Sequence, residues 1–300
     1  MQIAAHVLAY NVNSSLREVI NNISPHVDKI FIAYPKRPWK YKLSERSNRQ
    51  NPTSLNFIIE CSKGHNVEIV QGDWEYDEDT RNACFELAKS QGFDWFILQD
   101  ADEFFDDEGW DLILKELKKS KNETFFNTTW YNFWKSSEFV ILNDDGDIKS
   151  QKSNLALRCL QNTKYIRSGL PNINTKPKLI DARCYHYGYV RTNLEIETKI
   201  KTWTHTNEFD NEAWYSNKWL NWNKNTLNLH PTNPNSWKKA IKFPHTQPNF
   251  AKKFNYKIEF KTLSFKEKAN NFRYDIKHLP RYLMKKIKNN LKDRINVKFK

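Results

Sequence analysis

The chain has 300 residues, of which 39% are apolar and 14% aromatic, and this composition excludes a globally disordered protein because it can fill a sizeable core. The formal net charge of +13 is concentrated at one end. Residues 251–300 carry 16 Lys and Arg against 4 Asp and Glu, which leaves 32 against 31 in the first 250 residues. A neutral body with a basic tail predicts an anionic partner for the tail, such as lipid headgroups, nucleic acid or an acidic protein.

Apolar runs and helical patterns alternate through the first hundred residues. The spacing predicts helices at about 15–22, 54–63 and 79–90, with Gly64 and Gly92 at the ends of the last two. Strands are expected between these helices, at Ile3–Ala9, Val27–Tyr34, Val67–Val70 and Phe93–Leu98. This order predicts an α/β fold with a mostly parallel sheet flanked by helices.

The pattern loosens after residue 102. We expect a helix at Trp110–Lys121 and further strands at Glu123–Trp134, Ser137–Leu142, Leu155–Leu160, Lys164–Arg167 and Leu179–Tyr187. A mainly helical region follows from Leu194, broken by prolines. We therefore divide the chain into a core at 1–205 and a helical C-terminal region at 206–300.

The last stretch has apolar residues at helical spacing among lysines: Leu279, Leu283, Met284, Ile287, Leu291 and Ile295. Such a helix either lies on an anionic membrane or packs on the core. No segment reaches the ~18 apolar residues of a spanning helix, and the N-terminus lacks a basic leader. The four cysteines show no Cys-x-x-Cys spacing, which is typical of reduced thiols. We expect a cytoplasmic protein, with peripheral contact at the inner membrane face as the alternative.

A cluster of carboxylates follows the fourth expected strand, at Asp100, Asp102 and Glu103. Adjacent carboxylates repel each other, and their hard oxygen atoms suit Mg²⁺ or Mn²⁺. In open α/β sheets, ligands bind at the carboxyl ends of the strands. The cluster therefore predicts a divalent-cation site at the mouth of the sheet, with a solvated acidic turn as the alternative.

Several short motifs, taken in order, resemble a family 2-type glycosyltransferase with the GT-A fold. The resemblance covers about residues 3–200, and its motifs are Ala4–Asn11, Val27–Ile32, Gly72–Trp74, Arg81-Asn82, Asp94-Trp95, Asp100–Glu103 and His186–Arg191. It implies a metal-dependent, hexosyltransferase-like enzyme that uses Mn²⁺ or Mg²⁺. Such an enzyme moves a sugar from a nucleotide-sugar donor to a glycan, lipid or protein acceptor, with inversion at the anomeric carbon.

The resemblance also implies roles for individual residues. Asp100, Asp102 and His186 would hold the metal. The donor would be contacted by Tyr10, Asn11, Asp73, Arg81, Asp100 and Arg191, with Lys199 as a weaker candidate. The structural alternatives are a core position for His186, an ion pair with Asp77 for Arg81, and a surface position for Arg191.

The sequence departs from the family pattern in two places. Lys36 and Arg37 follow the second strand, where many relatives have acidic residues, and this leaves the donor nucleotide open. No Glu-Asp pair of the kind that supplies the general base in many inverting members is present, so Glu138 and Asp145 are candidates by position only. The aromatic run Trp130–Trp134 suits either an acceptor platform or strand core.

Two other functions are considered. A metal-dependent phosphotransferase or phosphohydrolase would use Asp100 as its nucleophile, but such enzymes usually place the Asp-x-Asp motif after the first strand. A non-enzymatic nucleic-acid-binding protein would use the basic, aromatic tail, but the neutral body and the lack of a reading motif argue against it.

Overall fold

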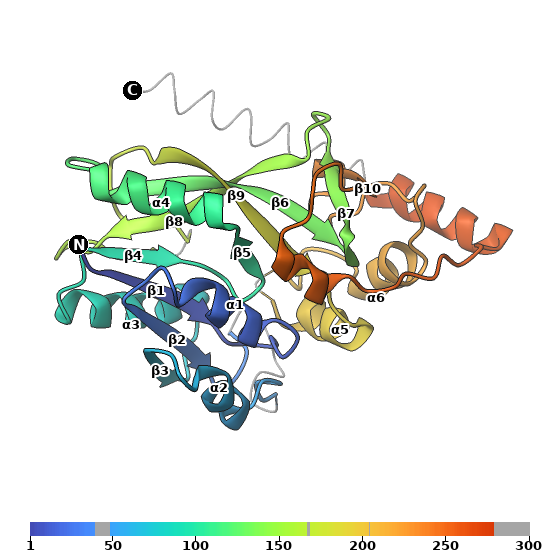
Figure 1. The fold of residues 1–300 in the computed structure, drawn as a ribbon. Coiled ribbons are helices and arrows are strands. Elements are labelled where there is room, and N and C mark those ends of the chain that lie inside the picture. The colour runs from blue at the N-terminus through green and yellow to red at the C-terminus, as the bar shows by residue number, and fades with distance from the viewer. Residues whose placement is uncertain (40–48, 167–168, 204, 279–300) are drawn as a thin grey trace, which may run out of the picture.

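The N-terminal part of the chain forms a parallel sheet in the computed structural model, which describes residues 1–39, 49–166, 169–203 and 205–278. Four strands pair in parallel in the order β3-β2-β1-β4 (Figure 1); their bounds are Ile3–Leu8 (β1), Lys29–Pro35 (β2), Val67–Gly72 (β3) and Trp95–Leu98 (β4). The connecting helices are Leu16–Ile23 (α1), Leu55–Ser62 (α2) and Asp77–Ser90 (α3). The structure thus confirms the α/β class, with a parallel sheet flanked by helices.

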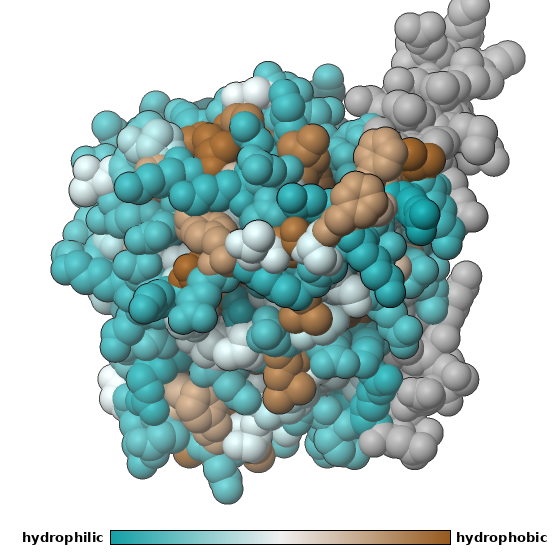
Figure 2. Space-filling model, turned by 90° about the vertical axis from the view of Figure 1, so that its right-hand side faces the viewer, coloured by the Kyte–Doolittle hydropathy of each residue, from teal (hydrophilic) through white to brown (hydrophobic). Residues whose placement is uncertain are grey.

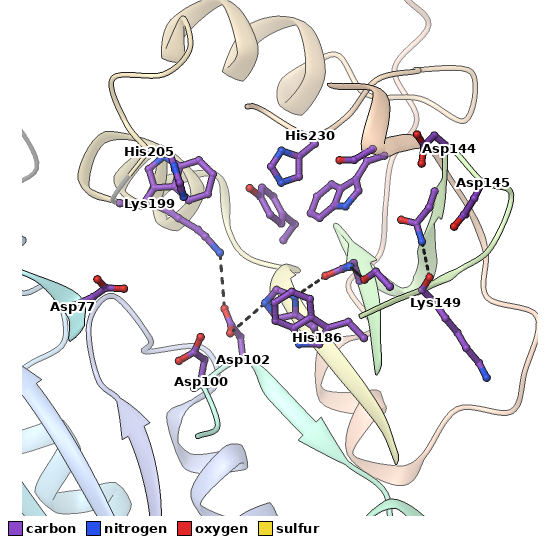
Figure 3. Close-up of a pocket in the computed structure, with 18 of the residues that line it drawn as sticks. Asp77, Asp100, Asp102, Asp144, Asp145, Lys149, His186, Lys199, His205 and His230 are labelled. Atoms are coloured by element: carbon purple, nitrogen blue, oxygen red, sulfur yellow. Dashed lines mark hydrogen bonds and ion pairs between the residues drawn. The ribbon is translucent and has the colours of Figure 1, made fainter. Parts of the chain in front are cut away.

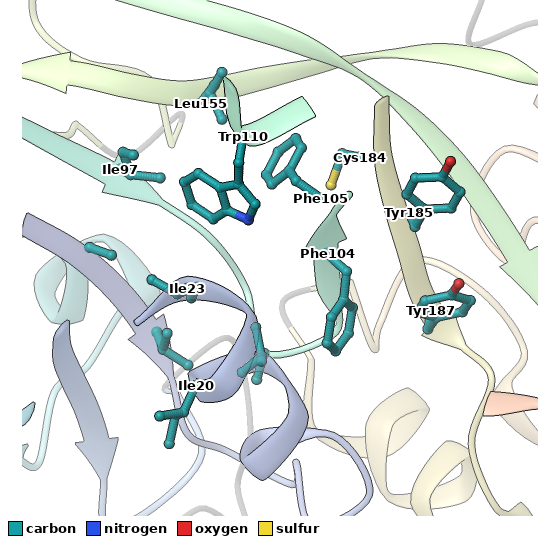
Figure 4. Close-up of a cluster of buried hydrophobic side chains, with 14 of the residues drawn as sticks. Ile20, Ile23, Ile97, Phe104, Phe105, Trp110, Leu155, Cys184, Tyr185 and Tyr187 are labelled. Atoms are coloured by element: carbon teal, nitrogen blue, oxygen red, sulfur yellow. The ribbon is translucent and has the colours of Figure 1, made fainter. Parts of the chain in front are cut away.

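Helices cover both faces of this sheet because successive strand residues point to opposite sides. Ile3 and Ala5 of β1 share an apolar cluster with α1, α2 and α4 (Asp107–Lys119), whereas Ala4 packs with Phe85 of α3 on the other face. Figure 4 shows the first cluster, in which residues from α1 and α4 surround the short strand β5 (Glu103–Phe105).

The second half of the sheet is mostly antiparallel. It contains β6 (Phe125–Trp134), β7 (Ser136–Asn143), β8 (Lys149–Arg158), β9 (Lys178–Tyr189) and β10 (Trp237–Lys242). The strand β8 joins the halves because it pairs with both β4 and β6. In turn, β9 runs parallel to β6 and antiparallel to β5. The prediction of a strand at Lys164–Arg167 is wrong for residues 164–166, which the structure describes. There, Tyr165 forms only an isolated β-bridge to Pro171.

The C-terminal region adds helices and one unexpected strand. Its helical segments are α5 (Asn193–Thr202), α6 (Asn211–Trp214), the π-helix η2 (Tyr215–Leu220), the 3₁₀ turns η3 (Pro234–Ser236) and η4 (Asn249–Phe254), and a helix at 265–278. A tryptophan-rich cluster packs α5, α6, η2 and the helix at 265–278 against β6 and β7, whereas η4 packs on the main core through Ala251 and Phe254. The region was predicted to be mainly helical, but β10 lies in it and extends the sheet beside β7. The amphipathic helix expected after Leu279 lies outside the described residues.

The sequence analysis expected reduced cysteines and no membrane-spanning helix. Cys61, Cys84, Cys159 and Cys184 are all free thiols, and all but Cys159 are buried. Within the described ranges, no helix has both the length and the apolar character needed to cross a membrane.

Candidate functional site

A pocket of about 770 Å³ opens at the carboxyl end of β4, where the two halves of the sheet meet. The start of α3 and the β4–β5 turn form one wall, and β6, β8 and β9 form the floor (Figure 3). The opposite wall consists of Lys199, Trp203, His205, His230, Ser236 and Trp237. Among the predicted site residues, the pocket brings together Arg81, Asp100, Asp102, Asp145 and His186.

Asp102 lies at the centre of a charged cluster in this pocket. One carboxylate oxygen, Oδ2, accepts a hydrogen bond from Arg191 Nη2 at 2.6 Å and lies 3.9 Å from Lys199 Nζ. The other, Oδ1, lies 3.6 Å from His186 Nε2. Burial alone would raise the pKa of Asp102, but the charge of Arg191, with His186 and Lys199, holds it well below its usual range. Asp102 is therefore ionised, and the alternative of a surface position for Arg191 is wrong because that side chain is buried.

Lys199, beside Asp102, loses its proton more readily than an ordinary lysine because its pKa is lowered. Burial lowers the pKa of Lys199 to about 8, and the neighbouring Arg191 lowers it too, whereas Asp102 and Asp100 raise it. Its Nζ donates to the carbonyl oxygen of Gly188 at 2.9 Å, which fixes the ammonium group at the pocket wall. The group is placed to meet an anionic ligand.

The pairing of β5 with β9 places His186 opposite the acidic cluster. Glu103 and His186 are partners in this pairing, and the Tyr187 backbone N–H donates to the Asp102 carbonyl at 2.7 Å. The sequence indicated that His186 lies at the end of its strand. In the structure it lies inside β9, which continues to Tyr189. Glu103 has a structural role, because its carboxylate accepts from Trp130 Nε1 at 2.9 Å and from the Asp100 backbone N–H at 3.1 Å.

A hydrogen bond from the neighbouring strand orients the His186 ring. Its Nδ1 lies 2.7 Å from Asn132 Oδ1, and Asn132 Nδ2 donates to Ser150 Oγ at 3.0 Å. Because an amide oxygen only accepts, His186 Nδ1 carries a hydrogen, and the ring turns Nε2 toward Asp102. The ring also stacks on Trp130, with centroids 5.0 Å apart.

Gly188 lets the backbone pass close to this ring. A Cβ atom at position 188 would lie 2.5 Å from His186 Nε2 and 3.2 Å from Lys199 Nζ. Any other residue would push on the two groups that face Asp102. The absence of a side chain is thus a geometric requirement of the site.

The donor atoms fit a divalent cation in part. In the segments that the structure describes, no three His, Cys, Asp or Glu side chains gather as a ligand set. Asp102 Oδ1 and His186 Nε2, however, are two possible ligand atoms that face each other at 3.6 Å. Two ligands at about 2.1 Å from one metal ion lie roughly 3 to 4 Å apart. Metal-binding histidines typically donate their other ring N–H to a carbonyl or carboxylate oxygen, as His186 does.

Four predicted donor contacts do not line this pocket, namely Arg191, Tyr10, Asp73 and Asn11. Tyr10 packs on Trp39 with ring centroids 5.3 Å apart, and Asp73 forms an ion pair with Arg37. Asn11 has a left-handed backbone with φ of 55°, and its Nδ2 donates to the Glu195 carbonyl at 3.0 Å. Asn11 thereby ties the end of β1 to α5. A role of these four residues in donor binding stays a prediction.

Arg81 does line the pocket, but it already has a partner. Its Nη2 lies 3.5 Å from Asp77 Oδ2, the ion pair that the sequence left as the alternative. Both residues border the pocket beside Asp100. The guanidinium group is nevertheless positioned next to the carboxylates of the β4–β5 turn.

The two candidate bases differ in position. Asp145 borders the pocket on the exposed turn between β7 and β8, where its Oδ1 accepts from the Asp147 backbone N–H. Glu138 is exposed on β7 and does not border the pocket. The geometry therefore separates two residues that the sequence could not rank.

The sequence reasoning missed two histidines of the C-terminal wall. His205 Nδ1 lies 2.6 Å from Glu208 Oε1, and the ring borders the pocket. His230 Nδ1 accepts the backbone N–H of Asn233 at 3.0 Å, and burial lowers the pKa of His230 to about 3, so that ring is neutral. The His-x-x-Glu spacing of residues 205–208 was the one local signal that could have indicated the first pair.

Comparison with known proteins gives distant similarity only. No family model matches the chain, and no curated protein matches it. Similar solved structures include S. aureus TarS, at 8% identity and a TM-score of 0.40 over 74% of this chain and 43% of that one. Another is glucosyl-3-phosphoglycerate synthase from Mycobacterium tuberculosis in complex with Mn²⁺, UDP and glucosyl-3-phosphoglycerate, at 12% identity and a TM-score of 0.30 over 44% of each chain.

A third similar structure is 4-diphosphocytidyl-2C-methyl-D-erythritol synthase from Anaerococcus prevotii, at 13% identity and a TM-score of 0.35 over 65% of this chain and 93% of that one. The chain thus spans less than half the length of the first two proteins. These similarities are too low to assign an activity, so the function has to come from the pocket itself.

Proposed function

We propose that the chain is a GT-A-type glycosyltransferase that moves a sugar from a nucleotide-sugar donor to a hydroxyl group of a glycan, lipid or protein. The proposal rests on one observation, that acidic and basic side chains line the same pocket at the carboxyl end of the parallel strand β4. Asp100 and Asp102 lie there with Arg81, His186 and Lys199. A nucleotide sugar needs such a set, because its diphosphate is anionic and its hydroxyl groups bind carboxylates.

A divalent cation, Mn²⁺ or Mg²⁺, would be held by Asp102 and His186, whose ligand atoms face each other at 3.6 Å. A third ligand from Asp100 stays a prediction, because among the described residues these side chains do not form a set of three. When bound, such an ion neutralises the charge that develops on a leaving diphosphate. Arg191 holds Asp102 in place through the 2.6 Å hydrogen bond. Lys199 and Arg81 bring positive charge to the phosphate oxygens from two sides of the pocket.

The transfer also needs a base for the acceptor. The acceptor oxygen forms a bond to the anomeric carbon, the bond from that carbon to the diphosphate oxygen breaks, and the acceptor proton passes to the base. Two groups at the pocket are placed for this role. Asp145 is the first, and His205 is the second, because Glu208 accepts from its Nδ1–H and leaves Nε2 free to take a proton.

The test combines a binding screen with one variant. We expect sugar nucleotides of UDP, GDP, CMP or TDP to raise the melting temperature in the presence of Mn²⁺. Asp102→Asn, which keeps the size of the side chain, should abolish this shift and the transfer of sugar. Glu138→Gln is the matched control, since Glu138 lies outside the pocket, and it should behave as the unaltered protein. A folded Asp102→Asn variant with full Mn²⁺-dependent activity would contradict the proposal.

A further inference from the structure

The helix at 265–278 is fixed on the body by its polar face. Tyr274 is buried, and Asp275 Oδ1 lies 2.8 Å from Nζ of Lys218, a fully buried lysine of η2. The same Nζ donates to Asn271 Oδ1 at 2.7 Å. These contacts fix which side of the helix faces the protein.

The opposite side of this helix is apolar and exposed. Phe265, Phe272 and Ile276 are 88%, 66% and 57% exposed. Their spacing of seven and four residues places them on one helical face, directly opposite Tyr274. A surface helix ordinarily buries its apolar face, whereas this helix buries its polar face. Figure 2 shows this side of the molecule, on which apolar side chains gather among hydrophilic ones.

Positive charges flank this apolar face. At 100° per residue, Lys268 lies on one side of it, and Lys266, Arg273 and Lys277 lie on the other. Both carboxylates of the helix are engaged elsewhere, since Glu267 pairs with Lys261 at 2.5 Å and Asp275 pairs with Lys218. The outward side therefore presents an apolar ridge between two cationic edges.

We propose that the helix at 265–278 binds the surface of an anionic phospholipid bilayer. Phe265, Phe272 and Ile276 enter the interface, while the flanking Lys and Arg side chains meet the headgroup phosphates. The charge pattern selects this partner. A second copy related by two-fold symmetry would bring the same cations face to face, and the aliphatic Ile276 offers no ring for stacking on bases. The proposal stands apart from the glycosyl-transfer proposal.

The experiment measures cosedimentation of the full chain with vesicles. We compare phosphatidylcholine alone with a mixture that contains about 30% phosphatidylserine. We expect binding to the mixed vesicles, weakened by salt, and little binding to phosphatidylcholine. The variant Phe265→Ser/Phe272→Ser/Ile276→Ser should lose about tenfold or more in affinity. The matched control is Leu160→Ser/Leu179→Ser/Leu194→Ser, which removes three exposed apolar side chains at other places and should bind normally.

Four results would overturn the proposal. The first is wild-type affinity in the helix variant, because residues 279–300 would then be sufficient for binding. The second is a dimer in the unaltered protein that the helix variant loses, without vesicle binding in either. The third is salt-sensitive binding of DNA in place of vesicles. The fourth is a drop of several degrees in the melting temperature of the helix variant, which would mean that these side chains pack against the protein.

Discussion

The close approach at Gly188 leads to a quantitative prediction for Gly188→Ala. The added methyl group would lie 2.5 Å from Nε2 and 2.9 Å from Cε1 of His186, about 1 Å inside an ordinary contact distance. Lys199 can yield, because it is long and flexible. His186 cannot move without giving up the 2.7 Å hydrogen bond to Asn132 and the stacking on Trp130.

Two effects, one on stability and one on metal binding, follow from this overlap. Overpacking of a tight site typically costs about 1–3 kcal/mol, which for a chain of this size lowers the melting temperature by a few degrees. The displaced ring no longer directs Nε2 at Asp102, and disturbance of a metal ligand's support typically lowers metal affinity about 10- to 100-fold. A 10- to 100-fold loss of Mn²⁺ affinity corresponds to about 1.4–2.7 kcal/mol, so the two costs are similar in free energy and need separate measurements.

Isothermal titration with Mn²⁺ and a thermal melt separate these effects. Gly92→Ala is the control, because Gly92 has a φ of 81° and open space around it. That variant should lose about 1 kcal/mol of stability through its left-handed backbone and keep its Mn²⁺ affinity. If Gly188→Ala folds and binds Mn²⁺ as tightly as the unaltered protein, the assigned role of His186 is wrong.

Three further predictions concern other contacts. Asn132→Leu removes the acceptor for His186 Nδ1, and we expect a 10- to 100-fold loss of Mn²⁺ affinity in a titration; unchanged affinity would exclude the orienting role. Asp275→Ala strands the buried Lys218 charge and should cost about 3 kcal/mol in a denaturant melt, most of which the double variant with Lys218→Met recovers. Burial lowers the pKa of Lys135 to about 8, so above pH 8 the unfolded chain binds more protons than the folded one. The unfolding free energy should therefore rise by roughly 1–2 kcal/mol between pH 7 and 9.5, relative to Lys135→Met, and equal slopes for the two proteins would contradict this.

The N-terminal half was predictable because its signals are local. Each strand is a short apolar run, and each helix has its apolar face at regular spacing. The helix expected at 54–63 is found as α2, and the Ser54 side chain caps it by accepting from the Phe57 backbone N–H. Asp100 and Asp102 were found because a strand end is visible in the sequence. The structure places both in one pocket with His186, and their shared role as metal ligands stays a prediction.

Other elements left no local signal. The sequence of β10 is Trp-Lys-Lys-Ala-Ile-Lys, and its three lysines obscure the apolar pattern of a strand. These lysines are present because β10 lies at the edge of the sheet, where charged side chains are favoured. At three residues, β5 is too short for any period to appear. Asn132 looked like one more position in an aromatic strand, and only the pairing of β6 with β9 brings it to His186.

The ion pair between Asp102 and Arg191 joins positions 89 residues apart. During synthesis, the ribosome must add all of those residues before the buried carboxylate meets its counter-charge. Closing so long a loop is slow, which makes this pair a late event in folding. A nascent chain that ends before β9 would contain Asp102 but not Arg191. Such a truncated product could not form the pocket.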